Sequence, residues 1–159
     1  MSEFVIREAT DEDGPALARL MDETVRGGPS EEVSERPGLD RPASSFAERG
    51  GRLWLVFCDG EVVGSLGLTA HGRPKEFELS MICLTPETRG QGLAAALLAG
   101  ANAFAAASGG ERLSLWIDVA LEDVQRFCER QGFIREPGAR ARHDGTGALE
   151  CRFSRAVIA

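Results

Sequence analysis

The sequence has no tyrosine, a single lysine and only four cysteines in 159 residues. The cysteines are Cys58, Cys83, Cys128 and Cys151. They form no CxxC pair and each lies in an apolar or amphipathic stretch, so we expect neither a zinc site nor a disulfide framework. Such cysteines are interpreted by default as small buried hydrophobic side chains.

Long apolar runs are also missing, since no stretch approaches the roughly 18 residues that a membrane span requires. The first residues, MSEFVIREAT, contain neither a basic leader nor an apolar core, so we expect no secretory signal, a cytoplasmic location and no membrane partner. The formal charge of −7 at pH 7 argues against nucleic acid as the main partner, because phosphate binding needs a basic face. An acidic balance is compatible with a cationic substrate.

What is present is an ordinary globular composition with clear strand and helix patterns. Asp59-Gly60 is a strong hairpin signal, and Thr10 can cap the first helix. Ser45 with Glu48 predicts a capping box for a short helix around Phe46. Strands are expected at residues 4–8, 53–58, 62–69, 76–84, 113–117, 133–142 and 148–157, and helices at 11–25, around 46, at 92–107 and at 121–131.

The order of these elements predicts the fold class. Hairpins flank one strand–helix–strand crossover, so the sheet must contain both parallel and antiparallel pairs. Residues 76–84 and 113–117 should form the central parallel pair. We therefore predict one α/β (α+β) domain over residues 1–159, with a mixed central sheet of about six to seven strands and helices on both faces.

The most informative stretch is residues 84–94, LTPETRGQGLA, where a strand ends and a glycine-rich loop opens a helix. Backbone N–H groups at a helix start are unpaired and lie at the positive end of the helix dipole, so they attract phosphate. Glycines let the chain approach phosphate without interference from a Cβ atom. The pattern therefore predicts a phosphate-binding loop.

This loop carries a resemblance to a known family. Residues 89–94, RGQGLA, look like the pyrophosphate loop Arg/Gln-x-x-Gly-x-Gly/Ala of the GNAT family of N-acetyltransferases, and Pro86 sits where these proteins often have a proline. Residues 127–133, FCERQGF, resemble the family's Leu-Tyr-x-x-x-Gly-Phe segment. The order of elements matches along nearly the whole chain, although residues 26–51 match poorly. The resemblance implies a GNAT-like fold that uses acetyl-CoA as cosubstrate without a metal.

A dinucleotide-binding fingerprint is the main alternative. Residues 90–95 also fit G-x-G-x-x-A, and Asp118 follows at the end of the next strand, where a ribose-binding acid would lie. In that fold the first glycine follows the strand almost directly, whereas residues 85–89 intervene here. The fold also needs repeated crossovers, and this chain has room for one. A glycine turn without a ligand would not explain Arg89 together with the downstream Gly-Phe segment, so we favour the acyl-CoA interpretation.

The resemblance implies cofactor-binding roles for the end of the strand and for the loop. In the family this strand bulges near its end, and freed backbone amides bind pantetheine and face the thioester carbonyl. These amides would be Ile82 and Leu84, with Cys83 between them, and they would stabilise the oxyanion of the tetrahedral intermediate. Asp118 occupies a position where the family often has an asparagine. The residues implied to hold the pyrophosphate are Arg89, Gly90, Gln91, Gly92, Leu93 and Ala94.

Glu78 is the candidate general base. The acceptor amine must lose a proton before it attacks the thioester. Alternation along residues 76–84 puts Glu78, Ser80 and Ile82 on one face, and Glu78 matches the family's strand glutamate, which acts as a base, often through water. The alternative is that Glu78 is an exposed strand residue near a loop.

Cys128 is the second candidate catalytic residue, because it aligns with the family's common proton-donating tyrosine. A thiol is not excluded as a donor, since its reference pKa of about 8.5 is lower than the value near 10 of tyrosine. The favoured alternative is a small cysteine buried on a helix.

The function implied is transfer of an acetyl group from acetyl-CoA to a primary amine, by direct attack in a ternary complex rather than through a covalent acyl-enzyme. The amine-bearing acceptor can be a small molecule or a protein N-terminus. Dimers are frequent in the family, which leaves a homodimer open. The missing tyrosine and asparagines also leave open a catalytically silent domain that binds or senses acyl-CoA.

Overall fold

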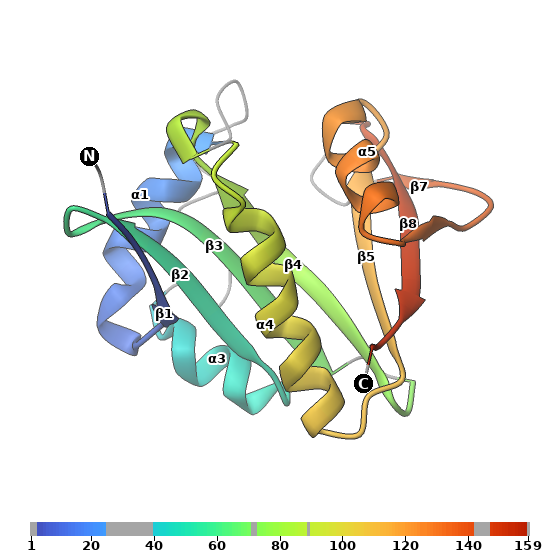
Figure 1. Ribbon diagram of the computed structural model, residues 1–159, viewed down its shortest axis with the longest axis horizontal. Coiled ribbons are helices and arrows are strands. Elements are labelled where there is room, and N and C mark those ends of the chain that lie inside the picture. Colours follow the sequence, from blue (N-terminus) through green and yellow to red (C-terminus); the bar gives the residue numbers. More distant parts are fainter. Residues whose placement is uncertain (1–2, 25–39, 71–72, 89, 142–146, 159) are drawn as a thin grey trace. The chain divides into compact units, whose positions relative to one another are not determined.

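The computed structural model describes residues 3–24, 40–70, 73–88, 90–141 and 147–158 (Figure 1). Its strands are β1 (Phe4–Glu8), β2 (Arg52–Cys58), β3 (Glu61–Ala70), β4 (Glu76–Leu84), β5 (Arg112–Asp118), β6 (Ile134–Arg135), β7 (Arg140–Ala141) and β8 (Leu149–Ala156). Its α-helices are α1 (Gly14–Thr24), α3 (Pro42–Glu48), α4 (Leu93–Ala107) and α5 (Glu122–Arg130). Short 3-10 turns, η1 (Asp11–Asp13) and η2 (Pro86–Thr88), lie before α1 and α4. No helix within these ranges is long and apolar enough to cross a membrane.

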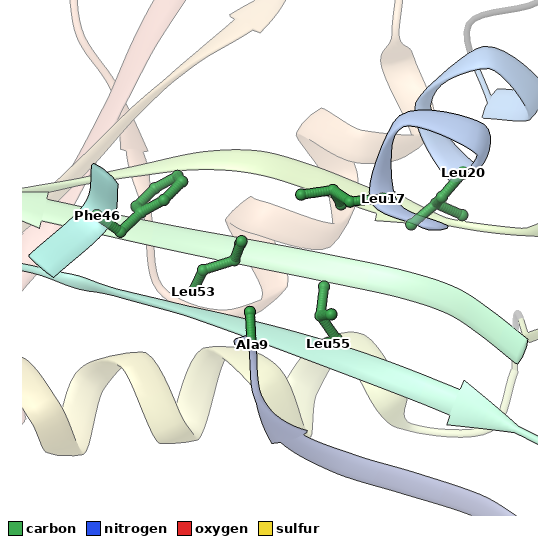
Figure 2. Packing of buried hydrophobic residues seen from close by; sticks show 6 residues of the cluster. All are labelled: Ala9, Leu17, Leu20, Phe46, Leu53 and Leu55. Atoms are coloured by element: carbon green, nitrogen blue, oxygen red, sulfur yellow. The ribbon is translucent and has the colours of Figure 1, made fainter. Parts of the chain in front are cut away.

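The strands pair in the order β1-β2-β3-β4-β5-β8-β6, and β7 also pairs with β8. β4 and β5 are parallel, with Glu76–Glu78 opposite Arg112–Ser114, whereas β1–β2, β2–β3 and β5–β8 are antiparallel. Helices α1 and α3 lie on one side of β2 and β3, and α4 lies on the other side (Figure 2). The predicted mixed sheet, its parallel pair and helices on both faces are therefore confirmed.

Two local predictions need correction. The capping box at Ser45 and Glu48 is wrong, because the helix begins at Pro42, whose fixed φ suits the first helical turn and places Ser45 inside the helix. The single strand expected at residues 133–142 is two short strands, β6 and β7. Pro137, which has no N–H to donate, lies between them with Gly138, whose φ is +90°.

The chain divides into two compact units. The first comprises Met1–Ala70 and Ser80–Ala101, and the second comprises His71–Leu79 and Asn102–Ala159. The core of the first unit lies between the helices α1 and α3 and the strand β2 (Figure 2). Its buried cluster consists of Ala9, Leu17, Leu20, Phe46, Leu53 and Leu55.

The second unit has its own core. Apolar side chains at alternating positions of β5 and β8 are buried there, and the ring of Phe77 meets that of Phe104 edge-on, with centroids 6.4 Å apart. The tail is held by Asn102 on α4, whose Nδ2 donates to the carbonyl oxygen of Ile158 at 2.7 Å and whose Oδ1 accepts from the Ile158 N–H at 3.0 Å. The buried strand residues are Leu113, Leu115, Ile117, Cys151 and Phe153.

Candidate functional site

The loop before α4 contains two glycines with left-handed backbone conformations. Gly90 has a φ of +78° and Gly92 a φ of +74°, a region that is strained for residues with a Cβ atom. A Cβ atom added at either glycine would meet no atom within 4 Å, so the space beside both is open. Gly90, Gln91 and Gly92 are all exposed, whereas Leu93 is buried. Arg89, the first residue of the predicted motif, lies outside the described residues.

Helix α4 presents its N-terminus to this loop. The N–H of Ala96 donates to the carbonyl oxygen of Gly92 at 3.1 Å, which is the first intrahelical bond of the helix. The N–H groups of Leu93, Ala94 and Ala95 therefore have no partner within the helix, and they lie at the positive end of its dipole. Open glycines and the N–H groups of a helix start together can bind an anionic phosphate group.

The start of the loop is held by two buried threonines, which the sequence analysis missed. The hydroxyl of Thr88 donates to the carbonyl oxygen of Thr85 at 2.6 Å, and the N–H of Thr85 donates to Val63 on β3 at 3.0 Å. Both threonine side chains are buried, and the Thr85 hydroxyl has no hydrogen-bond partner among the described residues. The η2 turn therefore links the end of β4 firmly to β3.

Strand β4 is irregular near its end. Met81 has a φ of +50°, and its carbonyl oxygen accepts a hydrogen bond of 2.6 Å from the hydroxyl of Ser65 on β3. Met81 and Cys83 pack against the core cluster of the first unit, while Ile82 is 43% exposed. Regular alternation is therefore interrupted at Met81, so the prediction that alternation places Glu78 and Ile82 on one face fails across this residue.

Glycines in β3 make room for the end of β4. A Cβ atom at Gly64 would lie 2.6 Å from Leu84 Cδ2, and one at Gly67 would lie 2.4 Å from the ring of Phe46. Leu84 and the helix α3 can therefore approach β3 closely. Glycine inside a strand indicates such an approach, and this was the signal in the sequence that could have identified the contact.

The remaining predicted residues, Glu78, Asp118 and Cys128, belong to the second unit. Glu78 is partly buried and lies in register with Ser114 on β5. The Asp118 carboxylate accepts a hydrogen bond of 2.8 Å from the N–H of Ala120, so it shapes the turn into α5. The structure thus brings together residues 82–94 in the first unit, apart from Arg89, which it does not describe.

Cys128 is enclosed rather than presented to solvent. Its side chain is 4% exposed, and burial, with a smaller contribution from Glu129, raises the pKa of the thiol to about 11. A thiol with this pKa is a weaker acid than an ordinary thiol, so it is poorly suited to give a proton to a departing thiolate. The environment favours the packing interpretation of Cys128.

A buried ionic cluster ties β4 to β8 in the second unit. Arg152 pairs with Glu76 and, at 2.7 Å, with Glu136. Burial opposes ionisation of Glu136, but hydrogen bonds from Ser154 and Arg152 outweigh it and hold the pKa of Glu136 below its usual value. No group of three or more metal-ligating side chains is found in the part of the chain that the structure describes.

Comparison with known proteins identifies similar chains. A model of the Acetyltransferase (GNAT) family matches residues 17–133. No curated protein matches the sequence.

Three solved structures illustrate the likeness in fold. An acetyltransferase of the GNAT family from Streptococcus pneumoniae is 22% identical, covers 98% of this chain and 100% of its own, and has a TM-score of 0.74. Ard1 from Thermoplasma volcanium is 16% identical, with coverages of 98% and 99% and a TM-score of 0.79. A phosphinothricin acetyltransferase from Sinorhizobium meliloti, solved in complex with AcCoA, is 21% identical, with coverages of 97% and 88% and a TM-score of 0.73. At these identities the likeness shows a shared fold.

Proposed function

Because this chain belongs to the GNAT acetyltransferase family, we propose that it transfers an acetyl group from acetyl-CoA to a primary amine by direct attack in a ternary complex. The observation that carries the proposal is the pair of left-handed glycines, Gly90 and Gly92, opening onto the N-terminus of α4. This arrangement suits the pyrophosphate of acetyl-CoA, because the N–H groups of the first turn and the positive end of the helix dipole would meet an anion there. Arg89, Gln91, Leu93 and Ala94 complete the proposed loop.

The irregular end of β4 supports a role in holding the thioester. A positive φ at Met81 turns the backbone out of its regular pattern. We assign the N–H groups of Ile82 and Leu84, on either side of Cys83, to the pantetheine arm and the thioester oxygen. Backbone donors fixed in this way would stabilise the negative charge that develops on that oxygen. Asp118, which orders the turn after β5, is assigned to the border of the same ligand.

Glu78 is proposed as the base. It accepts a proton from the ammonium form of the acceptor, directly or through water, and the amine nitrogen then forms a bond to the acetyl carbon. The nitrogen of the tetrahedral intermediate then gives its second proton to water, collapse of the intermediate breaks the carbon–sulfur bond, and the CoA thiolate leaves with its electron pair. Cys128 is an unsuitable donor to that thiolate, because it is enclosed and its pKa of about 11 makes it a weaker acid than an ordinary thiol, so the proton comes from solvent.

The acceptor class stays broad within this proposal. Proteins of similar fold include Ard1 and a phosphinothricin acetyltransferase, and these two names do not indicate a common acceptor. We propose a primary amine on a small molecule or a protein N-terminus, in a cytoplasmic protein that acts as a single domain, alone or as a homodimer.

The test is the release of free CoA thiol from acetyl-CoA in the presence of a panel of amines that includes small amines, amino acids and peptides with free N-termini. Amine-dependent release supports the enzyme. A second candidate, a silent domain that only binds acyl-CoA, is favoured by the enclosed position of Cys128 where the family has its tyrosine. Thermal stabilisation by acetyl-CoA with no thiol release from any amine would establish that alternative.

A further inference from the structure

One face of the sheet in the second unit is strongly polar. Residues in register on neighbouring strands point to the same face, so the pairing of β4, β5 and β8 arranges side chains in rows. Acidic, basic and hydroxyl groups occupy six of the eight positions in these rows. The rows are Glu76–Arg112–Ala156, Glu78–Ser114–Ser154 and Trp116–Arg152.

Ser114 lies at the centre of the middle row. Its side chain is fully buried, and its Oγ has no hydrogen-bond partner among the residues that the structure describes. A buried hydroxyl without a partner is unfavourable compared with an alanine of similar shape. The Ser114 hydroxyl therefore needs an acceptor within its reach.

Two side chains flank Ser114 in register. On β8, the Ser154 hydroxyl already accepts a hydrogen bond of 2.9 Å from Arg112 Nη2. On β4, Glu78 offers a carboxylate, which accepts hydrogen bonds and donates none when it is ionised. Neighbouring strands lie about 4.8 Å apart, so rotation of the Ser114 hydroxyl about its Cα–Cβ bond can direct it toward Glu78.

The charged groups around this row have partners of their own. Arg152 on β8 pairs with Glu76 on β4 and with Glu136, and Arg112 on β5 donates to Ser154. The neighbouring strand β3 carries one titratable residue, Glu61, at its first position. A hydroxyl can therefore orient the Glu78 carboxylate without adding charge to the cluster.

We propose that Ser114 is a positioning residue, whose hydroxyl donates to the ionised carboxylate of Glu78 and holds it where it receives the proton of the acceptor amine. The catalytic part of this inference rests on the proposed function. The donor stabilises the ionised carboxylate, which is the form that accepts a proton. Loss of the hydroxyl should therefore leave less of the carboxylate ionised on the acid side and disorder its side chain, while acetyl-CoA binding stays intact.

The contact is tested without any assay of activity by a double-mutant cycle on unfolding, measured in urea at pH 7. Ser114→Ala is made in the natural chain and in Glu78→Ala, which removes the acceptor. We expect Ser114→Ala to raise the equilibrium constant of unfolding by a factor about tenfold larger in the natural chain than in the Glu78→Ala chain, since bonds to charged groups contribute in this range. The control is Ser154→Ala, whose effect should be equal in the two backgrounds. Equal effects of Ser114→Ala in both backgrounds would overturn the proposal.

The positioning role is tested by kinetics with the amine found in the thiol-release assay. Ser114→Ala should lower kcat/KM for the amine about tenfold on the acid side of its pH profile, leave KM for acetyl-CoA unchanged, and shift the acid limb toward higher pH. Ser114→Cys introduces a side chain of similar size that is a weaker donor. Its kcat/KM should lie between the values of Ser114→Ala and the natural chain. Coupling to Glu78 with an unchanged pH profile would overturn the positioning role. Coupling without thiol release from any amine would instead reject the proposed function, and the catalytic role of Ser114 with it, while leaving the contact established.

Discussion

The hydroxyl of Ser65 on β3 donates a hydrogen bond of 2.6 Å to the carbonyl oxygen of Met81, the residue at which β4 leaves the extended conformation. Ser65 is fully buried, so water does not compete for this bond. A methionine has no intrinsic preference for a positive φ. The irregularity in β4 is therefore held by a side chain from the neighbouring strand.

Substitution Ser65→Ala should destabilise the protein by about 1–3 kcal/mol, because it leaves the partly buried carbonyl oxygen of Met81 without its donor. Urea unfolding measures the loss. The change should also weaken acetyl-CoA binding, since the backbone next to Ile82 would lose its support. Ser80→Ala, a change at a partly buried serine beside Met81 on β4, is the matched control and should have a smaller effect on both quantities. Equal effects of the two substitutions would show that the Ser65 bond does not hold the irregular backbone at Met81.

Acetyl-CoA should raise the melting temperature and NAD should not, because binding to the native state alone stabilises by about 2.7 kcal/mol at a hundredfold excess over Kd. Gly92→Val should abolish this shift, since it forces a β-branched residue into a left-handed conformation and fills the open space beside the loop. Gly109→Val is the control, because Gly109 has a φ of +81° and equally open surroundings after α4. It should lose comparable stability and keep the shift. Stabilisation by NAD alone would contradict the assignment.

Glu78→Gln should lower turnover most near and below neutral pH, where most of the amine is protonated and needs a base. Affinity for acetyl-CoA, measured by thermal shift or calorimetry, should stay similar. Glu61→Gln, at the exposed first residue of β3, serves as the control for loss of a charge. Rates of Glu78→Gln that match the natural chain across the pH range would remove Glu78 from the mechanism.

Cys128→Ala should retain at least about a tenth of the natural activity, a barrier change under about 1.4 kcal/mol. The physical reason is that Cys128 is enclosed and burial raises the pKa of its thiol to about 11, so it is poorly suited to give a proton to the CoA thiolate. The same burial predicts slow reaction of Cys128 with thiol reagents compared with the partly exposed Cys58. A loss of a hundredfold or more in a folded variant that still binds acetyl-CoA would establish a direct role.

Stability should depend on acid pH through Asp13. The hydrogen bond from Arg7 lowers the pKa of Asp13, helped by Thr10 and opposed by burial. A carboxylate with a lowered pKa in the folded state stabilises above its unfolded value, about 3.9, and loses this contribution as the pH falls through the lower folded value. Asp13→Asn should therefore unfold at lower urea at pH 7, with a difference from the natural chain that shrinks below about pH 4. Glu12→Gln, at an exposed neighbour, should show no such pattern, and a pH-independent difference for Asp13→Asn would contradict the linkage.

Local signals in the sequence predicted most of the fold. The bounds of β1 and β4 agree with the expected ranges, because hydrophobic period and flanking turn residues coincide there. The glycine loop before α4 could be predicted because glycine is the residue that adopts a positive φ without steric strain. Contacts between distant residues were not accessible in this way. Arg152 and Glu76 are 76 residues apart in the sequence, and the positive φ of Met81 depends on Ser65 rather than on its own type.

The side-chain amide of Asn102 hydrogen-bonds both the N–H and the carbonyl oxygen of Ile158. It replaces the two backbone bonds that a neighbouring strand would make. The tail after β8 is therefore fastened to the side of a helix without extending the sheet. Hydrogen exchange at the Ile158 amide should then follow the opening of α4 and not the fraying of a chain end. A single amide proton would report on the stability of the helix whose first turn faces the proposed phosphate site.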